Sequence, residues 1–96
     1  MLAERVVAAV TAVPGVVAMH PGRFGEVATH LPGRRVVGVQ LRADLVEVHV
    51  MLAWEADLLR TADAVRAAAV AAAGRPVDVV VQDVLGPHDS VPVAST

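Results

Sequence analysis

The chain contains no cysteine, lysine, asparagine, isoleucine or tyrosine, and these absences narrow what it can do. Without cysteine there is no disulfide framework, no thiol nucleophile and no cysteine–zinc site. Aromatic residues make up only 2% of the chain, so it lacks the platforms on which single-stranded nucleic acids stack their bases. The net charge of −2 gives no electrostatic reason to expect binding to DNA, RNA or anionic lipid.

Apolar residues, by contrast, are abundant, and most of them are valine and alanine. They make up 55% of the 96 residues, above the roughly 45–50% of an ordinary globular domain. A chain of this length forms one small domain, which buries only about 60–65% of the surface that its unfolded form exposes. We therefore expect a thin core of Val and Leu, with some of the apolar surplus buried between subunits.

The stretch over residues 6–19 (VVAAVTAVPGVVAM) carries no charge and is the place to look for a membrane or signal segment. It is shorter than the roughly 17–25 residues of a transmembrane helix. Pro14-Gly15 interrupts it, and the leader MLAER carries no net positive charge. We therefore expect a cytoplasmic protein without direct membrane insertion.

The first third of the chain predicts one helix and two short strands. Apolar residues at helical spacing predict a helix over residues 2–13, which Pro14-Gly15 ends. Residues 16–19 form a short apolar strand. A turn over residues 20–22 separates it from a second strand over residues 23–31.

Two clearer strands follow, over residues 36–42 and 46–54. Apolar and polar residues alternate along both. In the second strand, valines on one face alternate with Glu47 and His49 on the other. The short link around Asp44 favours an antiparallel hairpin between the two.

An alanine-rich helix comes next. Asp57 is a suitable N-cap, the helix is expected to end near Ala73, and Gly74 fits the position after its last turn. The predicted inward stripe is Leu58, Ala62, Val65, Ala69 and Ala72.

The last strand, residues 77–84, is apolar on both sides, with Val79 and Val81 on one face and Val80 and Val84 on the other. Such a strand usually has both faces covered. A second subunit could cover one of them.

Together these elements predict an α+β domain over residues 1–84. Its small mixed β-sheet carries two helices packed mainly on one face, in the order α-β-β-β-β-α-β. Residues 85–96 (LGPHDSVPVAST) read as a flexible C-terminal tail.

Three runs carry a family resemblance: FGEVATHLPGRRVVGVQL, then VEVHV, then AVRAAAVAAAGRPVDVVVQDV. With the opening helix and the Val-Pro-Gly-Val step at residues 13–16, they resemble the bacterial alkaline-shock-protein family, also called envelope stress response proteins. The likeness covers about residues 2–84. The segment WEADLLRTAD departs from it, because the family usually has a glycine-containing link before the second helix.

The resemblance implies a small α/β domain without known catalysis, linked to cell-envelope stress. Some relatives self-associate and are held near the membrane by a small membrane-anchoring protein. For this chain, the resemblance implies a homo-oligomer that is associated with a membrane, if at all, only through such a partner.

The histidines are the first candidates for chemistry. His30, Glu47 and His49 would form a metal-binding cluster if neighbouring strands brought them together, although no pair of histidines has the spacing of a zinc site. The alternative is that they are polar residues on the solvent-facing side of a half-buried sheet.

Catalytic motifs are absent from the sequence. No serine or threonine lies in a nucleophile-elbow context. The run His88-Asp89-Ser90 holds the residue types of a triad, but a triad is a spatial arrangement rather than a run of neighbours. We therefore expect no enzyme activity and no cofactor.

The surface residues offer better candidates. Arg34 and Arg35 could grip an acidic partner, or could simply keep an edge strand soluble. Trp54 continues the alternation of its strand and is expected to pack in the core; the alternative is an interface role. Val80 and Val84 would form the second apolar face of the last strand.

The sequence thus favours a non-enzymatic envelope stress response protein that self-associates or binds a protein partner. A ligand- or metal-binding domain that uses His30, Glu47 and His49 is the alternative. A nucleic-acid module built on Arg34, Arg35 and Arg42 is disfavoured by the acidic charge balance.

Overall fold

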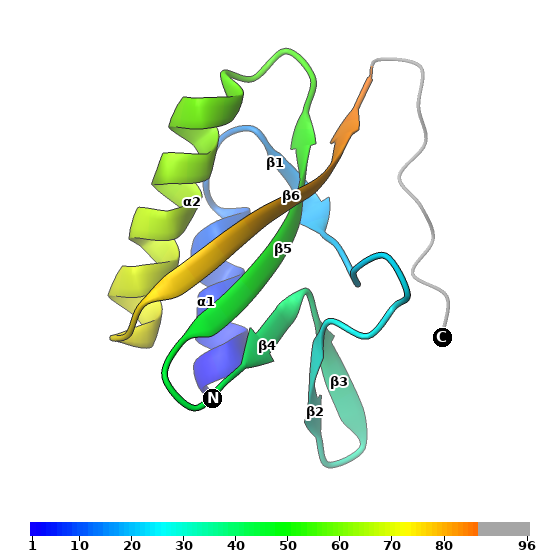
Figure 1. Cartoon of the computed structure of the whole chain (residues 1–96), viewed down its shortest axis with the longest axis vertical. Helices are drawn as coiled ribbons and strands as arrows, with labels where there is room; N and C mark the ends of the chain where they lie inside the picture. The colour runs from blue at the N-terminus through cyan, green and yellow to red at the C-terminus, as the bar shows by residue number, and fades with distance from the viewer. Residues whose placement is uncertain (87–96) are drawn as a thin grey trace.

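A computed structural model describes residues 1–86, and the predicted α+β fold is confirmed (Figure 1). Within this part of the chain the elements are α1 (Leu2–Thr11), β1 (Val16–Met19), β2 (Ala28–Leu31), β3 (Arg34–Val37), β4 (Val39–Leu41), β5 (Val46–Ala53), α2 (Leu58–Ala73) and β6 (Val77–Leu85). The tail predicted from residue 85 falls almost wholly outside the described residues, and Leu85 itself still belongs to β6.

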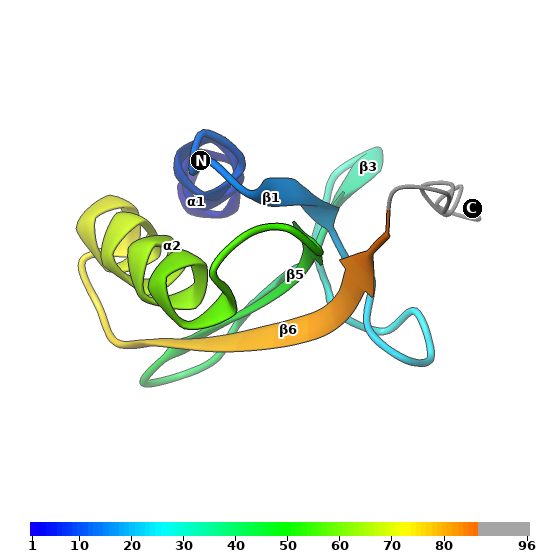
Figure 2. The ribbon, with the colours of Figure 1, turned by 90° about the horizontal axis from the view of Figure 1, so that it is seen from above.

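The main sheet is built around β5. It pairs in parallel with β6 along its whole length, and antiparallel with β1 and β4. Because a strand has room for one neighbour on each side, β1 and β4 must lie end to end along the side opposite β6. The predicted hairpin is confirmed as β4–β5, with Leu41 opposite Val46. Both helices pack on one face of this sheet (Figure 2).

The core lies between that face and the two helices. Alternate residues of β5, from Val46 to Leu52, are fully buried and meet Val6 and Val10 of α1 and Val65 of α2. Each buried valine or leucine stabilises the fold by roughly 1.5–3 kcal/mol relative to an exposed one. The predicted alternation of this strand is therefore confirmed from Val46 to Leu52.

Helix α2 is turned slightly from the predicted orientation. Asp57 caps it as expected, with Oδ1 accepting the Arg60 backbone N–H at 3.1 Å, and Gly74 ends it with φ +70°. However, Leu58 is 42% exposed, whereas Thr61 is buried. Thr61 lies against Gly15, where a Cβ would come within 3.2 Å of its side chain. This close approach brings Thr61 rather than Leu58 onto the buried face.

One predicted strand is divided in two at Gly38. This glycine has φ +88°, and a Cβ there would lie 2.7 Å from Met19 Cβ. The backbone therefore bends between β3 and β4. On the N-terminal side of the bend, β3 lies outside the main sheet and pairs with β2 as a separate hairpin.

The strand predicted over residues 23–31 is shorter than expected. Only Ala28–Leu31 is strand, and residues 20–27 form a loop. Polar contacts within the loop compete with strand pairing: the Phe24 N–H donates to Glu26 Oε2, and the Gly22 N–H donates to His20 Nδ1.

Strand β6 contains an irregularity at Gln82. Val50 is in register with Val81, but Met51 is in register with Asp83, so Gln82 is an extra residue on the β6 side. The extra residue places Val84 beside Leu52, on the core face. The prediction that Val84 shares a face with Val80 is therefore wrong.

Candidate interaction edge on β6

Strand β6 has a neighbour on one side only. It pairs with β5, and no other strand among residues 1–86 pairs with it. It forms the outer side of the sheet, away from α1 and β1 (Figure 2). An edge strand of this kind exposes backbone groups that can pair with another strand.

The register identifies which backbone groups are free. The Val46 N–H donates to the Pro76 carbonyl at 2.9 Å. In a parallel pair, every second residue of a strand directs its backbone N–H and C=O groups at the neighbouring strand. Like those of Pro76, the backbone groups of Asp78 and Val80 are therefore directed at β5. The N–H and C=O groups of Val79 and Val81 therefore point outward, and they have no hydrogen-bond partner among residues 1–86.

The far end of the same edge is closed. Beyond the irregularity the phase of the ladder changes, since the Trp54 N–H donates to the Leu85 carbonyl. The outward-facing N–H is now that of Val84, and it donates to Asp83 Oδ1 at 2.8 Å. The part of β6 that is open to pairing is therefore limited to residues 77–81.

Three residues of β6 project from the face opposite the helices. Val80 lies beside His49 in the register and is 37% exposed. Asp78 lies beside Glu47, and its carboxylate has no hydrogen-bond or ion-pair partner among residues 1–86. Gln82 completes the row. We call Asp78, Val80 and Gln82 the outer row of β6.

A polar network on β5 supports this row. His49 is buried between two side-chain oxygens, with Glu47 Oε2 at 2.7 Å from Nε2 and Gln82 Oε1 at 2.9 Å from Nδ1. Arg42 holds the other oxygen of Glu47 at 3.1 Å. The hydrogen bond from His49 lowers the pKa of Glu47 below its ordinary value, partial burial opposes this, and Arg42 lowers it further. The Gln82 oxygen is thus engaged, while its amide nitrogen has no partner among residues 1–86.

This geometry does not support the alternative of a metal-binding site. Glu47 and His49 do meet, but His30 is an exposed residue of the β2–β3 hairpin, paired with Arg35. Among residues 1–86, no three His, Asp or Glu side chains come close enough together to hold a metal ion. The predicted three-residue cluster is therefore not formed, because β3 leaves the main sheet at Gly38 and takes β2 with it.

The two predicted arginines have different surroundings. Arg34 reaches α1, where Nη2 lies 2.5 Å from Glu4 Oε2. This ion pair connects the β2–β3 hairpin to the helix layer. Arg35 is exposed and makes no ion pair among the described residues. Only Arg35 therefore remains free to meet a partner.

Trp54 is 55% exposed, so the prediction that it packs in the core is wrong. Strand β5 ends at Ala53, and the chain turns towards α2 before the indole could continue the buried face. Leu59 nearby is 80% exposed. Of the two roles considered for Trp54, only the interface role is consistent with this exposure.

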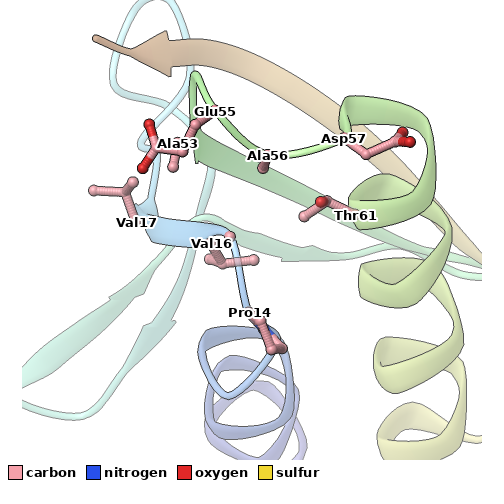
Figure 3. A pocket seen from close by; sticks show the side chains of 9 residues that line it. Pro14, Val16, Val17, Ala53, Glu55, Ala56, Asp57 and Thr61 are labelled. Carbon is pink, nitrogen blue, oxygen red and sulfur yellow. The ribbon is translucent and has the colours of Figure 1, made fainter. Parts of the chain in front are cut away.

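An open pocket of about 510 Å³ lies between the start of β1, the end of β5 and the start of α2 (Figure 3). It is lined by Pro14, Gly15, Val16, Val17, Ala53, Glu55, Ala56, Asp57 and Thr61. Thr61 is its only hydroxyl residue, and no histidine or arginine lies beside it. The lining therefore holds no nucleophile–base pair of the kind that an acyl-transfer site needs.

The fold and its open edge define a small α+β domain with one apolar strand available for pairing. No family model matches the chain, and neither a curated protein nor a solved structure matches it. No helix within residues 1–86 is long and apolar enough to cross a membrane.

Sequence reasoning singled out Val80 but missed Asp78, Gln82 and Asp83. Their alternation with valines was visible in the run VDVVVQDV. What could not be read from it is which residues face outward, because that depends on the partner strand and on the irregularity at Gln82.

Proposed function

We propose that this chain is a non-enzymatic assembly module that works by self-association through the open edge of β6. The observation that carries the proposal is the free stretch of residues 77–81, with outward-facing backbone groups at Val79 and Val81. Strand addition at such an edge is a common mode of protein recognition, in which backbone hydrogen bonds supply affinity and side chains supply specificity.

The side chains of this edge support the same proposal. Natural edge strands usually carry lysines, prolines or other devices that discourage pairing. Residues 77–81 contain neither lysine nor proline, and their only charged residue is Asp78. The closing contact of Asp83 lies beyond the open stretch. The β6 edge is thus protected against pairing at its C-terminal end and is open to pairing over residues 77–81.

The resemblance to envelope stress response proteins gives this activity a biological setting. It supports a role in cell-envelope stress, with a small membrane-anchoring protein as a further partner. That role is part of the proposal, and the edge of β6 is the surface on which we expect it to depend.

Light scattering over a wide concentration range tests the proposal. We expect a dimer or larger species for the wild-type chain, and a monomer for Val80→Glu at the same concentrations, because the change places a carboxylate in the centre of the edge. Val80→Thr keeps the shape and the strand preference and is the matched control, expected to stay associated. Circular dichroism should show that all three are folded.

A wild-type chain that stays strictly monomeric at every concentration would end the proposal. Unfolding of Val80→Glu would also contradict it, because that result would place Val80 in the core of the monomer.

A further inference from the structure

We infer that two copies of this chain join through antiparallel pairing of their β6 strands, around a two-fold axis that passes beside Val80. The inference rests on the proposed function and adds the orientation and register of the contact. Residues 79–81 of one copy would pair with residues 79–81 of the other, and Asp78 would lie opposite Gln82. The two main sheets would become one continuous sheet, with the helices of both copies on the same face.

The backbone provides the first argument. In an antiparallel pair, a residue with outward-facing N–H and C=O groups exchanges both hydrogen bonds with one residue opposite. An axis at Val80 places Val79 opposite the second copy's Val81, and Val81 opposite the second copy's Val79. The Val79 and Val81 groups of both copies then bond one another, which gives partners to backbone groups that have none within one copy.

The outer row provides the second argument, because it is complementary to itself. With the axis at Val80, the two Val80 side chains meet at the centre. Asp78 then lies opposite the second copy's Gln82. The Asp78 carboxylate and the Gln82 amide nitrogen both lack partners within residues 1–86, and one is an acceptor while the other is a donor.

The position of Asp78 beside Glu47 also favours this contact. Within its own sheet it is in register with Glu47, so two acidic residues stand side by side. Like charges on adjacent strands are unfavourable. The Gln82 amide of the second copy would offset that repulsion. Because the pair is symmetric, each dimer would contain two such contacts.

The neighbouring registers fit less well. An axis at Val79 would place the Asp78 carboxylate opposite Val80 on both sides of the dimer. An axis at Asp78 would bring two carboxylates face to face, which is destabilising. An axis beyond Val80 would require pairing at the C-terminal end of β6, where the Val84 N–H already donates to Asp83 Oδ1.

The absence of cysteine makes the register directly testable. We would introduce one cysteine at a time and oxidise the folded protein with a glutathione buffer. Val80→Cys is expected to form an intermolecular disulfide, because residues opposite each other at non-hydrogen-bonded positions have Cα atoms about 4.5 Å apart. Val79→Cys and Asp78→Cys should not, since their copies would lie more than about 7 Å from each other across the axis.

A second variant checks that the disulfide reports a paired edge rather than chance collision. Val79→Pro in the Val80→Cys background removes an outward-facing N–H but no bond to β5, a placement that edge strands tolerate. We expect this double variant to stay folded by circular dichroism and to lose most of the cross-link. A cross-link of undiminished yield would overturn the inference.

The outcomes separate the inference from the proposed function. If light scattering shows a dimer but Val79→Cys cross-links in place of Val80→Cys, or none of the three does, the register is wrong while self-association stands. If the wild-type chain is a monomer throughout, the proposed function and the inference both fall. Cross-linking at Val80 alone, from a dimer, supports both.

Discussion

At the scale of single residues, the contact between Glu47 and His49 connects the buried sheet to the edge. Glu47 is held on one oxygen by His49 and on the other by Arg42, while His49 also reaches Gln82 of β6. The pair lies on the face opposite the core. The network therefore adds to the pairing of β5 with β6 without taking part in the hydrophobic packing.

The lowered pKa of Glu47 predicts an acid-dependent contribution to stability. As the pH falls, the unfolded chain takes up a proton at this residue near the ordinary value of 4.5, before the folded chain does. The unfolded state then binds more protons, so the free energy of unfolding decreases as the pH is lowered. The contribution is complete above about pH 4.5 and is lost through the lower pKa of the folded protein.

Urea denaturation between pH 7 and pH 3 would test this. The wild type should lose more stability than Glu47→Gln, which keeps an oxygen acceptor but cannot titrate. The other carboxylates contribute equally to both proteins, so the difference isolates Glu47. Parallel curves for the two proteins would contradict the prediction.

At the scale of elements, the chain shows what alternation can and cannot reveal. The valines of β5, the cap at Asp57 and the stop at Gly74 follow from local chemistry, and the structure confirms them. The bend at Gly38 and the extra residue at Gln82 depend on neighbours distant in sequence. These two features separate His30 from Glu47 and place Val84 on the core face, so the alternative metal cluster is not formed among residues 1–86 and one face of β6 was mispredicted.

The bend between β3 and β4 leads to a prediction for Gly38→Ala. A Cβ at this position would meet Met19 Cβ at 2.7 Å and the His49 carbonyl at 3.0 Å, in a backbone with φ +88°. We expect a loss of roughly 3 kcal/mol or more in the free energy of unfolding, from backbone strain together with overpacking.

Gly33→Ala is the matched control for this change. Its φ of +75° is similar, but nothing lies within 4 Å of the added Cβ. It should cost only about 1 kcal/mol, the strain alone. Urea denaturation of both variants gives the comparison, and equal losses would show that close packing at the bend is not what requires glycine.

At the scale of the whole molecule, the thin valine and alanine core is a reason to expect association. The largest fully buried side chains are one leucine and a set of valines, and the exposed apolar residues include Val80, Trp54 and Leu59. A small domain has few other sources of stability. If the folded chain dimerises through β6, its melting temperature should rise with protein concentration, because dimerisation favours the folded state by mass action.

The self-complementary outer row makes Asp78→Ala the sharpest test of how that association is held together. Each dimer would lose two contacts between Asp78 and Gln82, each contributing about 1 kcal/mol. The dissociation constant should therefore rise about 30-fold, since 1.4 kcal/mol corresponds to a factor of ten. The monomer should not be destabilised, because the change also removes the repulsion beside Glu47.

Asp44→Ala removes the same charge from the exposed link between β4 and β5, and it is the matched control. Analytical ultracentrifugation should show that it associates as the wild type does. If both variants weakened the dimer equally, the effect would come from net charge rather than from the contact at Gln82. If neither did, Asp78 would not lie in the interface and the axis at Val80 would be wrong.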